Sequence, residues 1–217
     1  MKRLVLFALM MWGFSALAQN PFEKEILAYE KQDSTAMPAK GQWLFIGSSS
    51  FRLWKHFDRD MQGYPAFNRG FGGSTLADAL YYFDRMVAKY QPSWVFMYEG
   101  DNDLAKGKTP EAIVEEFKEF AARLKKVNAK AHLVFVAARP SLARTNNLEK
   151  QRRLNALIMD LTKGQKRWHY MDMHTPFFLP DGSLMNDIFV ADHLHLNDKG
   201  YEIFNRVVQE FIKKEVK

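Results

Sequence analysis

Five short segments of the chain are rich in apolar and aromatic residues and end at glycine or at polar residues. They span residues 43–46, 66–68, 94–98, 133–137 and 168–172. A short, continuously apolar run suits a strand that is buried on both faces of a sheet. The pattern therefore predicts five short strands in the interior of the protein.

Apolar residues at helical spacing fill the intervals between these segments. Helices are predicted over 75–89 and 148–161, from Thr109 onward, and from about Asn197 to near the end of the chain. Thr109 and Pro110 favour a helix start, because a threonine hydroxyl caps free N–H groups and proline fits the first turn. Strands that alternate with helices imply right-handed crossovers and parallel pairing. We predict an α/β fold: a single doubly wound, flavodoxin-like three-layer domain, with a mostly parallel sheet of about five strands and helices on both faces.

The first residues differ in kind from the rest of the chain. Lys2 and Arg3 precede an apolar run that ends in Ala16-Leu17-Ala18. A basic start, a short apolar stretch and small residues at its end are typical of a cleaved secretory signal, with a buried N-terminal helix as the alternative. The run is also shorter than the roughly 20 residues that cross a bilayer. We predict a signal peptide at 1–18, a polar N-terminal arm at 19–40 and the folded domain at 41–217. The protein is then secreted or periplasmic, without an integral membrane segment after signal removal.

The composition excludes several kinds of chemistry. The sequence has no cysteine, which rules out disulfides, thiolate metal sites, a catalytic cysteine and a lipid-modified cysteine. The formal net charge is +6, and loss of Lys2 and Arg3 with the signal leaves +4. Basic residues are scattered among acidic ones, as on a solvated surface, so no nucleic-acid partner is predicted.

Polar residues that follow the predicted strands are the candidates for chemistry, because ligands bind beyond the carboxyl ends of strands in a doubly wound sheet. A serine triplet, Ser48 to Ser50, follows the first strand after Gly47. Backbone N–H groups at the start of the next helix could face a developing oxyanion. Asn102 follows the third predicted strand, and its side chain could donate to the same oxyanion together with the N–H of Gly73.

Asp192 and His195 stand three positions apart, just before the last predicted helix. A serine hydroxyl is a poor nucleophile until a neighbouring base takes its proton. An imidazole base in turn needs a carboxylate to orient it and to stabilise its charged form. One loop could therefore supply both groups to a serine.

Three other patterns indicate different chemistry. Gly70-x-Gly72-x-x-Thr75 partly matches a dinucleotide-binding fingerprint, and Gly107-Lys108-Thr109 matches the end of a phosphate-binding loop. Both lack a required position of their motif. Asp192-His193-x-His195 could bind a metal ion if Asp172 and His174 joined it.

Taken together, the motifs resemble those of the SGNH hydrolases, also called GDSL-like lipases or acylhydrolases. Four blocks typical of that family occur in order within roughly 43–211: Gly47-Ser48-Ser49, the glycine-rich stretch 68–75, Gly100-Asp101-Asn102-Asp103, and Asp192-x-x-His195. The resemblance implies that Ser49 is the nucleophile and that Asp192 and His195 complete its triad. It also implies an oxyanion hole made by the N–H groups of Ser49 and Gly73 and by the side chain of Asn102.

One position departs from the family pattern. Ser48 stands where the family has an aspartate, which is not a member of the triad, so activity is still expected. The serine triplet followed by Arg52, Leu53 and Trp54 resembles a variant subgroup of the family. Ser48 and Ser50 are the alternative nucleophiles.

The resemblance implies a serine esterase or acylhydrolase that cleaves carboxylic esters through an acyl-enzyme and uses no metal and no organic cofactor. Its expected partners are small-molecule, glycan or lipid esters, such as small-acyl esters of carbohydrates (O-acetyl groups) or lysophospholipids. An acyltransferase on the same scaffold and a non-catalytic ligand-binding module are the alternatives.

Overall fold

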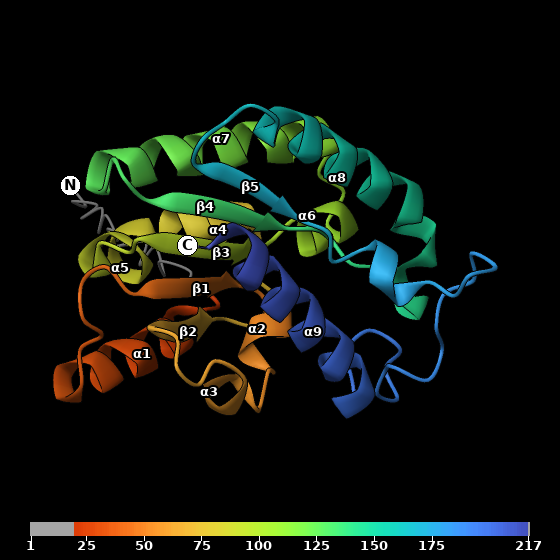
Figure 1. Ribbon diagram of the computed structural model, residues 1–217, viewed down its shortest axis with the longest axis horizontal. Coiled ribbons are helices and arrows are strands. Elements are labelled where there is room, and N and C mark those ends of the chain that lie inside the picture. Colours follow the sequence, from red (N-terminus) through yellow and green to blue (C-terminus); the bar gives the residue numbers. More distant parts are fainter. Residues whose placement is uncertain (1–19, 217) are drawn as a thin grey trace, which may run out of the picture.

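The structure is a computed structural model that describes residues 20–216. Its five strands form one parallel sheet in the order β2-β1-β3-β4-β5. The strands are β1 (Trp43–Gly47), β2 (Ala66–Gly70), β3 (Trp94–Tyr98), β4 (His132–Val136) and β5 (Trp168–Met171). Helices flank both faces of the sheet (Figure 1), so the predicted three-layer α/β fold is confirmed. The predicted signal peptide lies outside the described residues.

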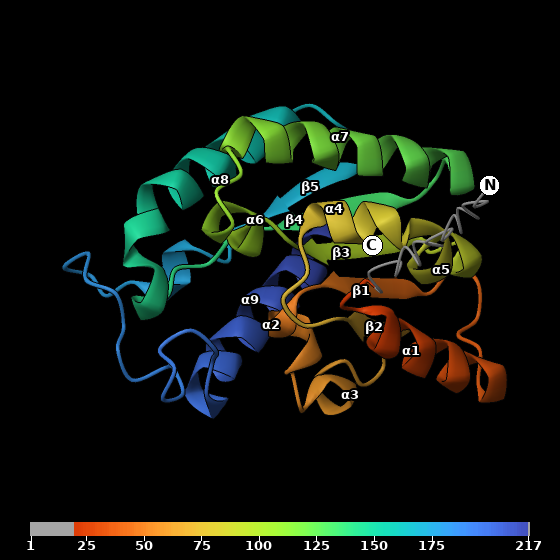
Figure 2. The same cartoon turned by 180° about the vertical axis from the view of Figure 1, so that it is seen from behind.

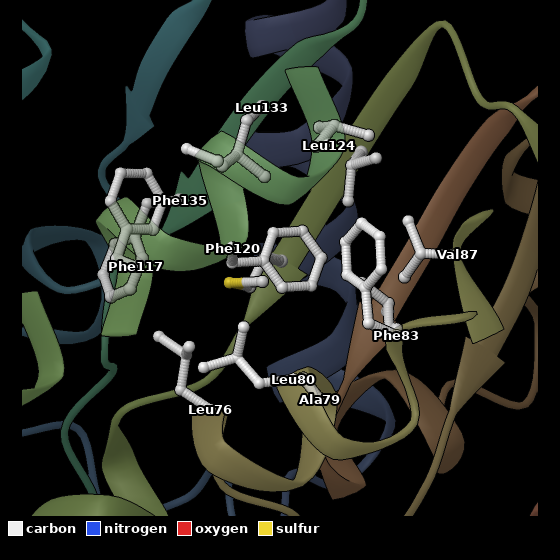
Figure 3. Close-up of a cluster of buried hydrophobic side chains, with 14 of the residues drawn as sticks. Leu76, Ala79, Leu80, Phe83, Val87, Phe117, Phe120, Leu124, Leu133 and Phe135 are labelled. Atoms are coloured by element: carbon white, nitrogen blue, oxygen red, sulfur yellow. The ribbon is translucent and has the colours of Figure 1, made fainter. Parts of the chain in front are cut away.

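One face of the sheet packs against five helices. These are α1 (Glu23–Thr35), α4 (Leu76–Tyr81), α5 (Phe83–Met86), α7 (Pro110–Val127) and α8 (Leu148–Thr162). Figure 3 shows part of this core, in which Phe120 of α7 meets Phe83 of α5 edge-on with ring centroids 5.1 Å apart. Leu44 and Ile46 of β1 belong to the same cluster.

The other face carries α2 (Ser49–Arg52), α3 (Phe57–Asp60) and α9 (Asp198–Glu215). Phe45, between Leu44 and Ile46, points to this side because successive strand residues alternate between faces. Its ring stacks on that of Phe96 in β3, with centroids 4.3 Å apart. Figure 1 shows α9 crossing in front of the strands, and Figure 2 shows α1 and α4 on the reverse side.

The helix predicted over 75–89 is wrong as a single element. The segment forms α4, α5 and the short 3-10 helix η1 (Ala88–Tyr90). The break falls at Tyr82, which has non-helical dihedrals (φ −90°, ψ 13°). Consecutive residues in an unbroken helix point about 100° apart. The break lets Tyr82 and Phe83 both bury their rings in the core.

The helix α1 lies in the segment predicted to be a polar arm, and it packs into the core through Ile26, which is fully buried. Asp33 forms a buried ion pair with Arg69 of β2. The hydroxyl of Tyr29 donates to the carbonyl of Gly70 at 2.5 Å. These contacts fix α1 to the end of β2, where the glycine-rich loop begins. Within residues 20–216, no helix combines the length and apolar character needed to cross a bilayer.

Candidate active site

The serine triplet lies where β1 ends and α2 begins. Gly47 has a φ of +142°, and a Cβ atom there would lie 2.2 Å from the carbonyl oxygen of Tyr98 in β3. Glycine is therefore required for the strands to approach and for the chain to turn into α2. Ser48 and Ser50 are buried, whereas Ser49 is partly exposed at the carboxyl edge of the sheet. The turn thus presents one serine of the three.

The structure joins Ser49, His195 and Asp192 in one chain of hydrogen bonds. Nε2 of His195 lies 3.0 Å from Oγ of Ser49, and Nδ1 of His195 lies 2.6 Å from Oδ2 of Asp192. A ring that carries its hydrogen on Nδ1 can donate to the carboxylate and accept from the serine. This arrangement is the one in which a histidine can draw a proton from a serine.

The loop that carries Asp192 and His195 is held by its own hydrogen bonds. Oδ1 of Asp192 accepts from the backbone N–H groups of Leu194 and His195, both at 2.9 Å. His193 adopts a left-handed conformation, with a φ of +56°, which tightens the turn. Desolvation would raise the pKa of Asp192, but the hydrogen bonds from the His195 ring and from the two backbone groups outweigh it and lower the pKa to about 2.

This low pKa predicts the form of the pH–rate profile. A carboxyl group whose pKa is lowered in the folded state contributes fully to stability at pH values above its pKa in the unfolded chain. It loses this contribution as the pH falls through its pKa in the folded state. Asp192 therefore stays ionised throughout mild acid. We expect the carboxyl group of Asp192 to add no acid limb of its own to log(kcat/KM) between about pH 4 and 7, as measured on 4-nitrophenyl acetate. A limb in this range that shifts in Asp192→Glu would contradict the assignment of Asp192.

Gly73 and Asn102 line the same cavity as Ser49 and His195, with a volume of about 250 Å³. Nδ2 of Asn102 donates to the carbonyl of Ser74 at 2.8 Å. An amide nitrogen carries two N–H groups, so one remains after this bond. Arg144 donates to Oδ1 of Asn102 at 2.9 Å, which fixes the orientation of the amide.

A buried carboxyl group contacts the residue that follows Gly73. Glu99, directly after β3, is 1 % exposed, and its Oε1 accepts from the Ser74 hydroxyl at 2.6 Å. Burial, together with the nearby Asp103 carboxylate, raises the pKa of Glu99 well above its usual value. Burial therefore favours the neutral form of Glu99, which places no negative charge beside the site. No motif in the sequence indicated this residue.

Two arginines of the cavity were also missed. Arg139 follows β4, and Arg144 lies in the 3-10 helix η2 (Leu142–Asn147). The position of Arg139 carried a signal, because it comes just after the fourth predicted strand, at the same edge of the sheet as the serines. Arg144 forms an ion pair with Asp101 in α6 (Asp101–Ala105), a contact that no local pattern indicates.

A second, larger cavity lies beside the hydrogen-bonded side chains of Asp192 and His195, with a volume of about 500 Å³. Asp192 and His195 line it together with Trp54, Leu196 and Tyr201. His195 thus lines both cavities. A substrate bound at His195 can therefore contact residues of both cavities.

The alternative patterns serve local structure in this fold. Thr75 caps α4 through a capping box with Asp78, and Thr109 caps α7. Asp172 accepts backbone N–H groups from His174 and Thr175. In the part of the chain that the structure describes, no three histidine, aspartate or glutamate side chains are grouped as metal ligands.

A parallel α/β sheet with a serine, histidine and aspartate linked at its carboxyl edge is an arrangement found among serine hydrolases. The model of the GDSL-like lipase/acylhydrolase family matches residues 41–203. The chain belongs to this family and is an ester-hydrolysing enzyme. The predicted family resemblance is thereby confirmed.

The chain is also similar to individual proteins with related names. The platelet-activating factor acetylhydrolase IB subunit alpha1 of Bos taurus is 27% identical over 167 residues, which cover 73% of this chain and 69% of the bovine protein. A GDSL-like lipase from Bacteroides thetaiotaomicron shares the fold with a TM-score of 0.75 at 19% identity, covering 88% of this chain and 98% of the lipase. A catalytic mutant of an acetylxylan esterase from Geobacillus stearothermophilus shares the fold with a TM-score of 0.67 at 15% identity, covering 80% of this chain and 95% of the esterase.

Proposed function

We propose that the protein is a serine esterase that removes short acyl groups, foremost acetyl, from larger alcohols. The observation that carries the proposal is the hydrogen-bonded chain from Ser49 through His195 to Asp192, beside a cavity lined by Gly73 and Asn102. Nucleophile, base and orienting carboxylate are the parts that acyl transfer through a serine requires.

In the proposed reaction, Oγ of Ser49 attacks the ester carbonyl carbon while Nε2 of His195 takes the hydroxyl proton. The N–H groups of Ser49 and Gly73 and the remaining N–H of Asn102 stabilise the oxyanion. His195 then protonates the leaving alcohol as the bond between the carbonyl carbon and the alcohol oxygen breaks. Water attacks the acyl-enzyme by the same route and releases the carboxylic acid.

The two cavities support a short acyl group and a larger alcohol. The cavity at Ser49 is small, with about 250 Å³, and Arg139 and Arg144 are among its polar lining residues. The larger cavity, which His195 also lines, has both aromatic and polar walls, which suit the alcohol portion. Two of the similar proteins are named for acetyl substrates, an acetylhydrolase and an acetylxylan esterase.

The acyl preference is tested with 4-nitrophenyl acetate, butyrate and octanoate and the purified protein from Gln19 onward. We expect kcat/KM to fall by about tenfold or more from acetate to octanoate, because a small pocket rejects added methylenes. A preference for octanoate would contradict the short-acyl proposal, and no turnover of any ester would favour a ligand-binding module. An added acceptor alcohol separates hydrolysis, which releases free acid, from acyl transfer.

We also propose that the protein acts outside the cytoplasm, in the periplasm or as a secreted enzyme. The support is the basic and apolar pattern of residues 1–18. N-terminal sequencing of the protein recovered from the periplasm or medium should begin at Gln19. Recovery of the full-length chain from the cytoplasm alone would contradict the proposal.

A further inference from the structure

Arg139 is a buried cation whose hydrogen-bond partners, in the part of the chain that the structure describes, are all uncharged. The residue is 3 % exposed, and among residues 20–216 no carboxylate oxygen lies within 4.0 Å of its guanidinium. Buried arginines are rare unless they are paired, because an isolated charge in the interior costs several kcal/mol. The position of Arg139 in the cavity of Ser49 therefore calls for a functional reason.

The side chain of Arg139 connects the loops of the nucleophile and the base. Its Nε lies 3.4 Å from Oγ of Ser50, the residue after Ser49. Its Nη2 donates to the carbonyl of Leu194 at 2.8 Å, next to His195. A planar guanidinium reaches two acceptors in a fixed relative geometry, which a lysine ammonium on a flexible stem does not do.

The backbone of Arg139 connects to the third loop of the site. Its carbonyl accepts from Nε2 of Gln151 at 3.1 Å, and the same nitrogen donates to Oδ1 of Asp101 at 2.8 Å. Asp101 precedes Asn102, the proposed oxyanion donor. Gln151 lies in α8 and is fully buried, so this link is shielded from water.

The backbone of Ala138, the residue before Arg139, is also held by hydrogen bonds. The side-chain amide of Asn155 donates to the carbonyl of Ala138 and accepts from its N–H, both at 3.0 Å. The start of the Arg139 side chain is thereby held to α8. Catalytic geometry must be kept within about 0.5 Å, which requires supporting residues that are themselves fixed.

We propose that Arg139 is a positioning residue that sets the distance between Ser49 and His195, acting through Ser50 and Leu194. The inference rests on the proposed function of these two residues. Arg139 also lines the cavity of Ser49, in which the oxyanion forms in the proposed reaction. Neutral partners in the resting enzyme leave its charge free to stabilise the developing anion.

Three variants test the proposal on 4-nitrophenyl acetate. Arg139→Lys keeps the charge but loses the planar guanidinium with its fixed donor geometry. Arg139→Ala opens a space that added guanidinium can fill. We expect kcat to fall by about tenfold in the lysine variant and about a hundredfold in the alanine variant, with KM within about twofold. Arg153→Gln, a change of an exposed arginine on α8, is the matched control with wild-type kcat.

Chemical rescue separates positioning from mere support of the fold. Millimolar guanidinium or ethylguanidinium should restore part of the kcat of Arg139→Ala and none of that of Ser49→Ala. A folded lysine or alanine variant with wild-type kcat would overturn the proposal, as would a kcat that follows only the folded fraction and shows no rescue. If the alanine variant does not fold, the kcat of the lysine variant tests the proposal: a loss of about tenfold supports it, and a wild-type kcat overturns it. An inactive wild type would instead refute the esterase function.

Discussion

Replacing Ser49 by alanine is expected to lower kcat for ester hydrolysis by about ten-thousandfold or more, with the fold unchanged. The reason is that, among residues 20–216, Oγ of Ser49 is the hydroxyl oxygen within hydrogen-bonding distance of the imidazole, 3.0 Å from Nε2 of His195. The side chain is small and partly exposed, so its loss leaves no large cavity in the core. Initial rates on 4-nitrophenyl acetate, with circular dichroism as a check on folding, measure the effect.

The neighbouring serines provide matched controls for this experiment. Ser48→Ala and Ser50→Ala change the same chemical group one position away, at buried sites. Both variants should still react covalently with a fluorophosphonate, Ser50→Ala more slowly because it removes the hydroxyl that Arg139 contacts, and mass spectrometry should locate the adduct on Ser49. Labelling that persists in Ser49→Ala and disappears in Ser48→Ala or Ser50→Ala would move the nucleophile to that serine.

Replacing His195 by alanine should reduce kcat about as far as Ser49→Ala, and the double variant should be no slower than either single one. Residues that work as one unit are not additive, because the loss of any essential member removes the whole mechanism. The measurement is the set of three kcat values on one substrate. Additive losses in the double variant would show that Ser49 and His195 act separately.

His193→Asn is the control for the histidine experiment. His193 is in the same loop and has a left-handed backbone, a conformation that asparagine tolerates well. The variant removes a second imidazole two positions from His195 while preserving the turn. Turnover close to that of the wild type is expected, and a loss as large as that of His195→Ala would contradict the assignment of the base.

Local patterns in the sequence were sufficient for most elements of the fold. All five strands occur where the apolar segments predict them, with ends that differ by up to two residues. Thr109 and Asn197 cap their helices through side-chain acceptors, as the predicted helix starts require. These features depend on interactions within a few residues, which the order of residue types fixes directly. The helix over 75–89 failed because tertiary burial of Tyr82 and Phe83 overrode the local helical pattern.

The sequence by itself determined the fold class, the family and the candidate residues Ser49, Gly73, Asn102, Asp192 and His195 at the carboxyl edge of the sheet. Only the tertiary structure decided which serine of the triplet is partly exposed, and that Ser49 and His195, 146 positions apart, lie within hydrogen-bonding distance. The same holds for the link from Arg139 to both loops and for the burial of Glu99. The physical reason is that such contacts depend on strand order and side-chain packing between distant segments, and no local spacing encodes either of them.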